Sequence, residues 1–276
     1  MFLCDENMED LTSMNRYLYH TGKLNIDFLS GSYVKLDSRW KTSLHRYAST
    51  RLYYVYKGEA VLYHDGKAIP MKPGFLYLIP ANLEISYQCP VYMEKLFFHI
   101  AVTNVENFDI LSNISKICQL PCSPELLAQL KQLHTSDNYY DLLHFKMLIF
   151  KTIVDCLDKE NLPPLKIKNF SPEILQAISY MQNNISIQLT AEQIAQALFI
   201  SRRRLQRHFK EETGLTIGAY LDRLLVYRAT QLMVNPQLSL RNISEQLGFC
   251  DQFYFSRRFK KLTGQTPSDF RKVLKI

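Results

Sequence analysis

Two segments of this chain, 50 residues apart, align without a gap and repeat one pattern of apolar, basic and glycine positions. The first reads "ISRRRLQRHFKEETGLTIGAY" over 200–220, and the second reads "CDQFYFSRRFKKLTGQTPSDF" over 250–270. Each copy, taken with the residues before it, predicts a short helix, a tight turn, a second helix closed by glycine, and a further helix, which is a helix-turn-helix unit. Gly214 and Gly264 stand where a helix C-terminus favours the positive φ of glycine. Any fold of this chain must therefore hold two such units.

The second helix of each copy, at 201–213 and 251–263, has one apolar face and one basic face. At 100° per residue Leu205 and Phe209 lie together, as do Phe255 and Phe259, so we expect these four to be buried. The outward faces carry side chains that suit the major groove of DNA, where Arg and Gln can bind guanine and adenine bidentately, and Lys can reach phosphates. A solvated basic face is the alternative for one copy, and two matched copies favour DNA binding. The predicted DNA-binding residues are Arg202, Arg203, Gln206, Arg207, Lys210, Asp251, Gln252, Phe253, Ser256, Arg257 and Lys260.

The positive charge lies in the same part of the chain. From residue 165 onward there are 17 Lys and Arg against 8 Asp and Glu, a net charge of +9. The whole chain has +7, so the preceding part carries −2. This asymmetry predicts that only the second half meets a polyanion. A basic solvated surface would give the same count, so the inference depends on the repeat.

An apolar segment, "TIGAYLDRLLVYRATQLMVN", separates the two copies. Its apolar residues keep helical spacing, which predicts one long and mostly buried helix. A rigid spacer of this kind can hold two recognition helices one turn of DNA apart, about 34 Å.

The segment "GFCDQFYFSRRFKKLTGQTPSDFR" resembles the signature of the AraC/XylS family of bacterial transcription regulators, and "IAQALFISRRRLQRHFKEETG" resembles the first helix-turn-helix of that family. The resemblance covers about residues 170–274. It implies a homodimer that binds double-stranded promoter DNA and works with RNA polymerase. The chain departs from the family at Phe199, where glycine is frequent, and at Cys250 and Phe253, where small polar residues are usual. Carried over, base reading falls on Arg203, Gln206, Arg207, Gln252 and Arg257.

The N-terminal part has the pattern of a small β-structure. Residues 20–105 read as short strands separated by turns at Lys57-Gly58, Asp65-Gly66 and Pro73-Gly74, and they are similar to the cupin-like sensor barrel of many family members. Helices are expected over 124–158 and a linker at 161–170. The predicted fold is α+β in two domains: a cupin-like β-barrel with helices over 1–160, and an all-α domain with two helix-turn-helix motifs over 171–276.

The predicted function is that of a ligand-responsive activator and not of an enzyme. The chain has no His-x-His pair, and His64 stands alone, so we expect no metal, no cofactor and no catalytic residue. A small-molecule effector such as a sugar could bind among aromatic and basic side chains, although the tyrosines could simply fill the barrel. The alternatives are a metal-dependent cupin enzyme fused to a DNA-binding domain, and an N-terminal domain that only dimerises or binds a partner protein. The candidate ligand-binding residues are Trp40, His45, Arg51, Tyr54 and Tyr56.

The cellular location is expected to be the cytoplasm. The N-terminal segment "MFLCDENMED" has neither the basic nor the apolar region of a signal peptide. No apolar run reaches the roughly 18 residues of a membrane span, so we expect no membrane partner.

Overall fold

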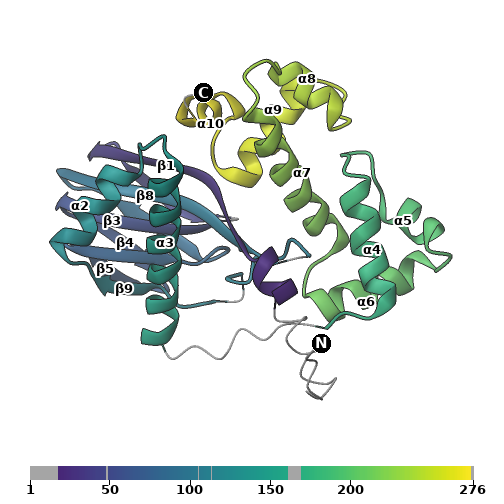
Figure 1. Ribbon diagram of the computed structural model, residues 1–276, viewed down its shortest axis with the longest axis horizontal. Coiled ribbons are helices and arrows are strands. Elements are labelled where there is room, and N and C mark those ends of the chain that lie inside the picture. The colour runs from purple at the N-terminus through teal and green to yellow at the C-terminus, as the bar shows by residue number, and fades with distance from the viewer. Residues whose placement is uncertain (1–17, 48, 105, 113, 161–168, 275–276) are drawn as a thin grey trace, which may run out of the picture. The chain divides into compact units, whose positions relative to one another are not determined.

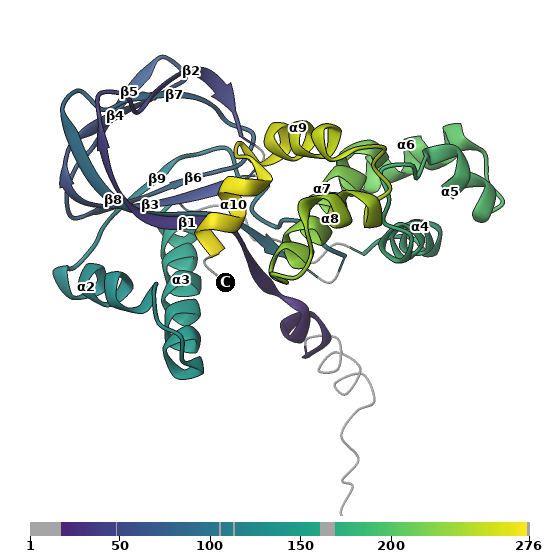
Figure 2. The same ribbon diagram turned by 90° about the horizontal axis from the view of Figure 1, so that it is seen from above.

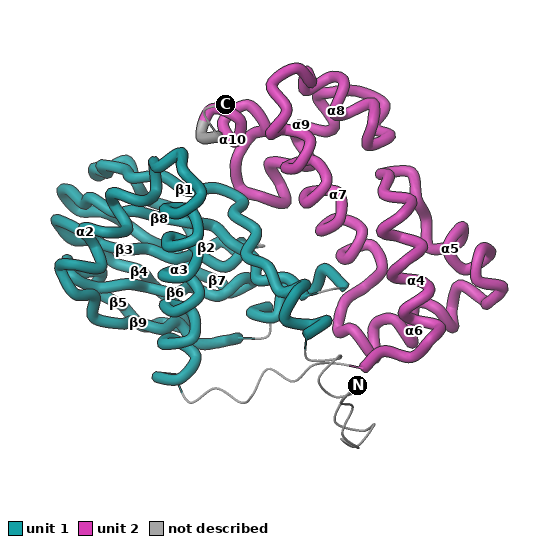
Figure 3. The backbone as a smooth tube through the Cα atoms, viewed as in Figure 1, with its two compact units in different colours: residues 1–163 teal, residues 164–276 magenta. Residues whose placement is uncertain are grey.

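The computed structural model describes residues 18–47, 49–104, 106–112, 114–160 and 169–274. The chain divides into two compact units, residues 1–163 and 164–276, which Figure 3 distinguishes by colour. The linker predicted at 161–170 lies, apart from its last two residues, outside the described residues. No helix in the described part of the chain is long and apolar enough to cross a membrane.

The first unit contains two antiparallel sheets. A five-stranded sheet has the order β1-β8-β3-β6-β9, and a four-stranded sheet has the order β2-β7-β4-β5. Because the described strands form two separate sheets, the predicted barrel is open and not a closed ring. The strands are β1 (Asn25–Asp37), β2 (Lys41–Arg46), β3 (Thr50–Gly58), β4 (Ala60–His64), β5 (Lys67–Met71), β6 (Phe75–Ile79), β7 (Glu84–Gln88), β8 (Tyr92–Thr103) and β9 (Cys118–Pro121).

The Asp-Gly turn in this unit forms where the sequence predicts it. Asp65 and Gly66 connect β4 to β5 with φ values of 49° and 71°. His64 pairs with Lys67 across this two-residue loop. Positive φ at both central residues is the geometry of the hairpin turn that matches the twist of the strands.

Two hydrophobic cores lie on opposite faces of the five-stranded sheet (Figure 2). One face packs against α2 (Pro124–Leu133) and α3 (Tyr139–Lys159) and buries Tyr54 of β3. The other face looks toward the four-stranded sheet and buries Tyr53. Successive side chains of β3 alternate between the two cores because a strand has a period of two.

The described residues of the second unit from 171 onward form helices joined by short turns (Figure 1). α7 runs between the two helix-turn-helix units and buries Tyr220, Leu224 and Ala229, as its apolar spacing predicts. The predicted α+β fold is confirmed. The helices are α4 (Pro172–Asn183), α5 (Ala191–Ala197), α6 (Arg202–Thr213), α7 (Ile217–Met233), α8 (Leu240–Gln246), α9 (Gln252–Thr263) and α10 (Pro267–Leu274).

Candidate nucleic-acid interface

The first helix-turn-helix consists of α5, a turn and α6. α5 begins with a capping box, in which the Thr190 hydroxyl accepts from the Gln193 N–H and the Gln193 side chain accepts from the Thr190 N–H. Ser201 caps α6 by accepting from a backbone N–H in the first turn. Leu205 and Phe209 are fully buried, as predicted. Local sequence therefore sets the ends of both helices, and the apolar face of α6 sets how it docks.

The outer face of α6 carries a row of basic and amide side chains. Arg202, Arg203, Gln206, Arg207 and Lys210 are all exposed. Among the described residues, Arg207 is the one member of this row with an ion pair, a long contact of 4.0 Å to a glutamate one turn further along. Arg207 Nη2 also lies 3.2 Å from His208 Nε2. The exposed row still presents guanidinium, ammonium and amide donors toward a ligand outside the chain.

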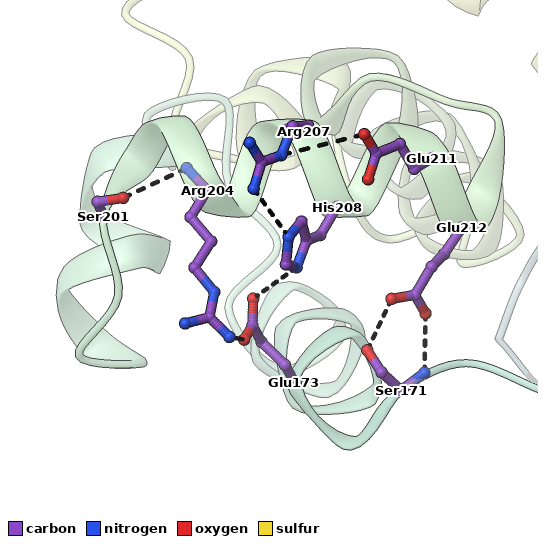
Figure 4. A network of polar contacts seen from close by, with 8 residues as sticks. All are labelled: Ser171, Glu173, Ser201, Arg204, Arg207, His208, Glu211 and Glu212. Atoms are coloured by element: carbon purple, nitrogen blue, oxygen red, sulfur yellow. Dashed lines mark hydrogen bonds and ion pairs between the residues drawn. The ribbon is translucent and has the colours of Figure 1, made fainter.

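A separate flank of α6 is held against α4 by polar contacts (Figure 4). Glu173 of α4 accepts from Arg204 Nη2 at 2.6 Å and lies 3.5 Å from His208 Nδ1. Ser171, at the start of α4, makes no side-chain cap within its own helix. Its N–H and its hydroxyl instead both donate to Glu212, each at 2.8 Å. Glu212 thus acts as the N-terminal cap of a neighbouring helix, α4. The positive end of the helix dipole also stabilises a carboxylate at this position.

The second helix-turn-helix repeats this construction with α8 and α9. Ser239 and Asn242 form the capping box of α8. Asp251 caps α9, and its Oδ1 accepts from the Tyr254 N–H at 2.6 Å. This hydrogen bond is the main cause that lowers the pKa of the Asp251 carboxyl below its usual value. The Asp251 side chain, which the sequence analysis placed among the DNA-binding residues, is therefore engaged in capping.

The faces of α9 follow the prediction as well. Phe255 and Phe259 are buried, and Phe253 is 76% exposed. Arg257 and Lys260 are exposed. Two further predicted residues, Gln252 and Ser256, are half-buried. The second face thus offers fewer polar donors than the first and has an exposed aromatic ring among them.

The two recognition helices are tied to their supporting helices at equivalent positions. Arg258, 50 residues after His208, donates through Nη2 to Asp222 of α7 at 2.6 and 2.8 Å, and through Nε at 3.1 Å. His208 lies close to Glu173 of α4 in the same way. Neither acidic partner is predicted by the sequence pattern. The repeat itself indicates that positions 208 and 258 share a role, but their partners lie 35 and 36 residues away in the chain.

A second connection joins the two helix-turn-helix units. The Ile187 N–H, in the loop between α4 and α5, donates to the Leu247 carbonyl oxygen at 3.0 Å. The Gln188 side chain donates to the Gly248 carbonyl oxygen, also at 3.0 Å. The turn of the second helix-turn-helix is therefore bound to the loop that precedes the first helix-turn-helix. These hydrogen bonds link the two motifs in addition to α7.

This arrangement can bind a polyanion through two similar surfaces, the exposed faces of α6 and α9. Each recognition helix has a packed back, a fixed flank and an exposed front. A helix of this kind fits the major groove, and its cations attract phosphates at any sequence. Guanidinium and amide groups can in addition distinguish base edges.

The five candidate ligand-binding residues of the first unit do not lie together. Trp40 stacks on Tyr87 with ring centroids 4.1 Å apart, on the side of the core between the sheets, and Arg51 is buried on β3. Tyr54 and Tyr56 belong instead to the core beneath α2 and α3, where the Tyr56 hydroxyl donates to a backbone carbonyl of α2. His45 is exposed on β2. In the described part of the chain, no three His, Cys, Asp or Glu side chains gather as a metal site.

Residues 194–273 match the family described as a helix-turn-helix domain. The Msm operon regulatory protein of Streptococcus mutans is 24% identical over 233 residues, which cover 81% of this chain and 84% of that protein. The lactose operon transcription activator of Staphylococcus xylosus is 22% identical over 231 residues, 80% of this chain and 82% of that protein. The fold of ToxT from Vibrio cholerae is similar over 92% of this chain and 100% of that one, with a TM-score of 0.54 and 14% identity.

Proposed function

We propose that this chain is a DNA-binding transcription regulator of the AraC/XylS family and that it activates transcription by placing α6 and α9 in successive major-groove segments of promoter DNA. The observation that carries the proposal is the pairing of two recognition helices within one compact unit, each with an exposed basic front. α7 and the loop before α5 hold the two helices together, so that one subunit presents both to the same duplex.

The roles of individual side chains follow from their places on the two helices. Arg203, Gln206 and Arg207 read bases from α6, and Arg257 does so from α9 with the partial help of Gln252. Further contacts to the DNA come from Arg202 at the start of α6 and from Ser256 on the flank of α9. Lys210 and Lys260 lie farther along each helix and contact phosphates. The exposed ring of Phe253 contacts the methyl group of thymine.

The first unit is proposed to act as a sensor that responds to a small molecule and changes how the DNA-binding units are presented to RNA polymerase and promoter. The relatives named above are regulators of operons, which supports a sensor in the cytoplasm over an enzyme. Metal analysis of the purified protein tests the rival idea of a metal-dependent cupin enzyme, since such an enzyme would carry about one metal ion per chain.

We propose further that the regulator is a homodimer that forms through α3. Tyr139, Leu143, Met147 and Val154 are exposed, and at 100° per residue they fall within about 80° of one another. The buried residues of α3, such as Phe145, face the sheet on the opposite side of the helix. An apolar stripe with this spacing fits a second copy of the same stripe across a two-fold axis.

The DNA-binding roles are tested by two substitutions on α6. Arg207→Ala should cost about 1–3 kcal/mol on the preferred sequence and relax sequence preference, because a base contact is lost. Lys210→Ala should weaken binding to all sequences alike and reduce the slope of log K against log salt concentration by about 1. Both are measured by fluorescence anisotropy on a site selected from random DNA.

Arg39→Ala, on the first unit, is the matched control for loss of one exposed charge. It should leave both affinity and salt slope unchanged. Equal binding of wild type and Arg207→Ala to every sequence would exclude the proposed reading face of α6.

A further inference from the structure

The space between the two sheets of the first unit contains an unusual group of basic side chains. Arg51 of β3 and Lys95 of β8 are each only 3% exposed. Arg51 pairs across the sheet with His99 of β8. These three side chains share the face of Tyr53, which looks toward the four-stranded sheet, because side chains two residues apart on a strand point the same way.

Aromatic rings surround these basic groups. Lys95 Nζ lies 3.3 Å from the ring centroid of Tyr53 and 4.0 Å from that of Trp40. The guanidinium carbon of Arg51 lies 3.0 Å from the ring centroid of Tyr47. These are cation–π contacts, and they compensate only part of the cost of removing a charge from water.

No acidic partner of this group lies among the described residues. Among the described residues, neither Arg51 nor Lys95 forms an ion pair with a carboxylate, and Arg51 Nε is buried without a hydrogen-bond partner. Glu94 is adjacent to Lys95 in sequence but points to the other face of the sheet, where it accepts from the Tyr33 hydroxyl. Buried charges in proteins are ordinarily paired, so an unpaired basic group of this kind is destabilising unless something else binds it.

The pKa values of Lys95 and His99 are lowered by this environment. Burial, and then the charge of Arg51, hold the pKa of Lys95 well below its usual value, with the Cys89 thiol the one neighbour that acts in the opposite direction. Burial, Arg51 and Lys95 likewise hold the pKa of His99 well below its usual value. An anion that arrives between the sheets would raise both pKa values, so its binding would take up protons from solution.

We infer that Arg51, Lys95 and His99 form the head-group site for a small organic anion, a carboxylate or a phosphate ester, whose body packs among Trp40, Tyr53 and the neighbouring rings. The inference rests on the proposed sensor role and gives the chemical class of its effector. A guanidinium binds a carboxylate or a phosphate through paired hydrogen bonds, and an ammonium binds either as a point charge. His99 Nδ1 already lies 2.9 Å from the Ser30 hydroxyl, whereas a neutral sugar or alcohol would leave Arg51 and Lys95 without an anionic partner among the described residues.

The test compares anions with neutral molecules of the same shape on the full-length protein. Glucuronate and glucose 6-phosphate are paired with glucose, benzoate with benzyl alcohol, and octanoate with octanol. At least one anion should raise the melting temperature and bind in titration calorimetry, with a binding enthalpy that changes with the ionisation enthalpy of the buffer because protons are taken up. Its neutral counterpart should do neither. Failure of every anion to bind, or equal binding of the matched neutral compound, overturns the inference on the wild-type protein alone.

Lys95→Met and Arg51→Met locate the site. Each should weaken the anion that binds by about 10- to 100-fold, as expected for a hydrogen bond to a charged group. Lys95→Met should also raise the melting temperature of the ligand-free protein, because an unpaired buried charge is removed, which a purely structural lysine would not do. Lys57→Met is the matched control, an exposed lysine near the end of β3, the strand that carries Arg51, and should bind as wild type does. An anion that binds Lys95→Met and Arg51→Met at full strength sits elsewhere, for example on α6, and refutes the assignment.

DNA binding is measured on the same samples to separate the two proposals. If a neutral compound alters DNA binding and Lys95→Met does not change the response, the anion site is wrong and the ligand-responsive regulator stands. If an anion binds at Lys95 and leaves DNA binding unchanged at all promoter fragments, the site is correct and the sensor role fails.

Discussion

Replacing Gly248 by alanine should destabilise the second helix-turn-helix, because the turn between α8 and α9 has neither the backbone conformation nor the space for a side chain at this position. Gly248 has a φ of 77°, in the left-handed region. A non-glycine residue pays about 1–2 kcal/mol there. A Cβ at this position would also lie 2.4 Å from the Ser186 hydroxyl oxygen, which accepts a hydrogen bond from the Gln188 N–H.

The expected magnitude is the sum of these effects. Ser186 must turn away, and the hydrogen bond it then loses is worth about 1 kcal/mol. Alanine restricts the unfolded chain more than glycine does, which stabilises the folded protein by about 0.5–1 kcal/mol. Gly248→Ala should therefore cost about 2 kcal/mol. This corresponds to roughly 10 °C in the melting temperature of a unit of this size.

The first helix-turn-helix provides a matched control at the same turn position. Phe199 has a φ of 55°, and its side chain is 96% exposed, so it meets the strain of the backbone without the steric clash. Phe199→Gly should stabilise the protein by about 0.5–1 kcal/mol, since relief of the strain exceeds the entropy cost of glycine. Adding a side chain at Gly248 should thus lower the stability, and removing the side chain at the equivalent Phe199 should raise it.

Differential scanning calorimetry of the full chain is the assay, with the transition of the second unit recognised as the one that DNA shifts upward. Ser186→Ala should remove most of the steric part when combined with Gly248→Ala, which leaves only the backbone strain. The reasoning is refuted if Gly248→Ala melts within 1 °C of wild type, or if Phe199→Gly melts below it.

Three more outcomes are expected from the same structure. Arg258→Met should cost about 1–2 kcal/mol in chemical unfolding, since the pair is partly exposed; a double-mutant cycle with Asp222→Asn that shows no coupling would contradict a stabilising bidentate contact. Because the pKa of Asp251 is lowered, its cap stabilises the protein above the usual carboxyl pKa of about 4. This contribution disappears as the pH falls through the folded-state pKa. Asp251→Asn should therefore lose less stability than wild type between about pH 6 and pH 2.5. Leu143→Asp should convert the proposed dimer to a monomer in sedimentation velocity with its melting temperature nearly unchanged, whereas a monomeric wild type would exclude this interface.

The features that sequence predicts correctly are those set by local chemistry or by period. Thr190 and Gln193 form their capping box within four residues, and Gly214 ends α6 in the left-handed conformation with a φ of 78°. The burial of Leu205 and Phe209 follows from helical spacing, and the copy at Phe255 repeats it. Such features need no knowledge of the rest of the fold, because each is decided by residues within one or two turns of helix.

The features that sequence reasoning missed are set by packing between distant elements. Ser171 has the sequence of a helix cap, but Glu212 of another helix accepts its hydrogen bonds, and nothing local distinguishes the two cases. The candidate ligand residues of the first unit depend on strand period. The positions of Arg51 and Tyr54 on one strand differ by an odd number, which places them on opposite faces of the sheet. Strand period, applied strictly, favours Tyr53 as the companion of Arg51.

Unpaired positive charge has a different meaning in the two units, and burial decides which meaning applies. An exposed arginine such as Arg203 is solvated, and having no partner among the described residues costs the folded protein almost nothing. It becomes informative only because a second helix repeats the pattern. A buried lysine such as Lys95 would require several kcal/mol of compensation if it stayed charged, so one occurrence already calls for a physical reason. DNA supplies the missing anions at the surface of the second unit, where many weak contacts add up and salt competes with all of them. Between the sheets, a single anion would have to satisfy the whole group. Because Arg51 and Lys95 are buried there, salt at physiological concentration should weaken its binding far less than it weakens the binding of DNA.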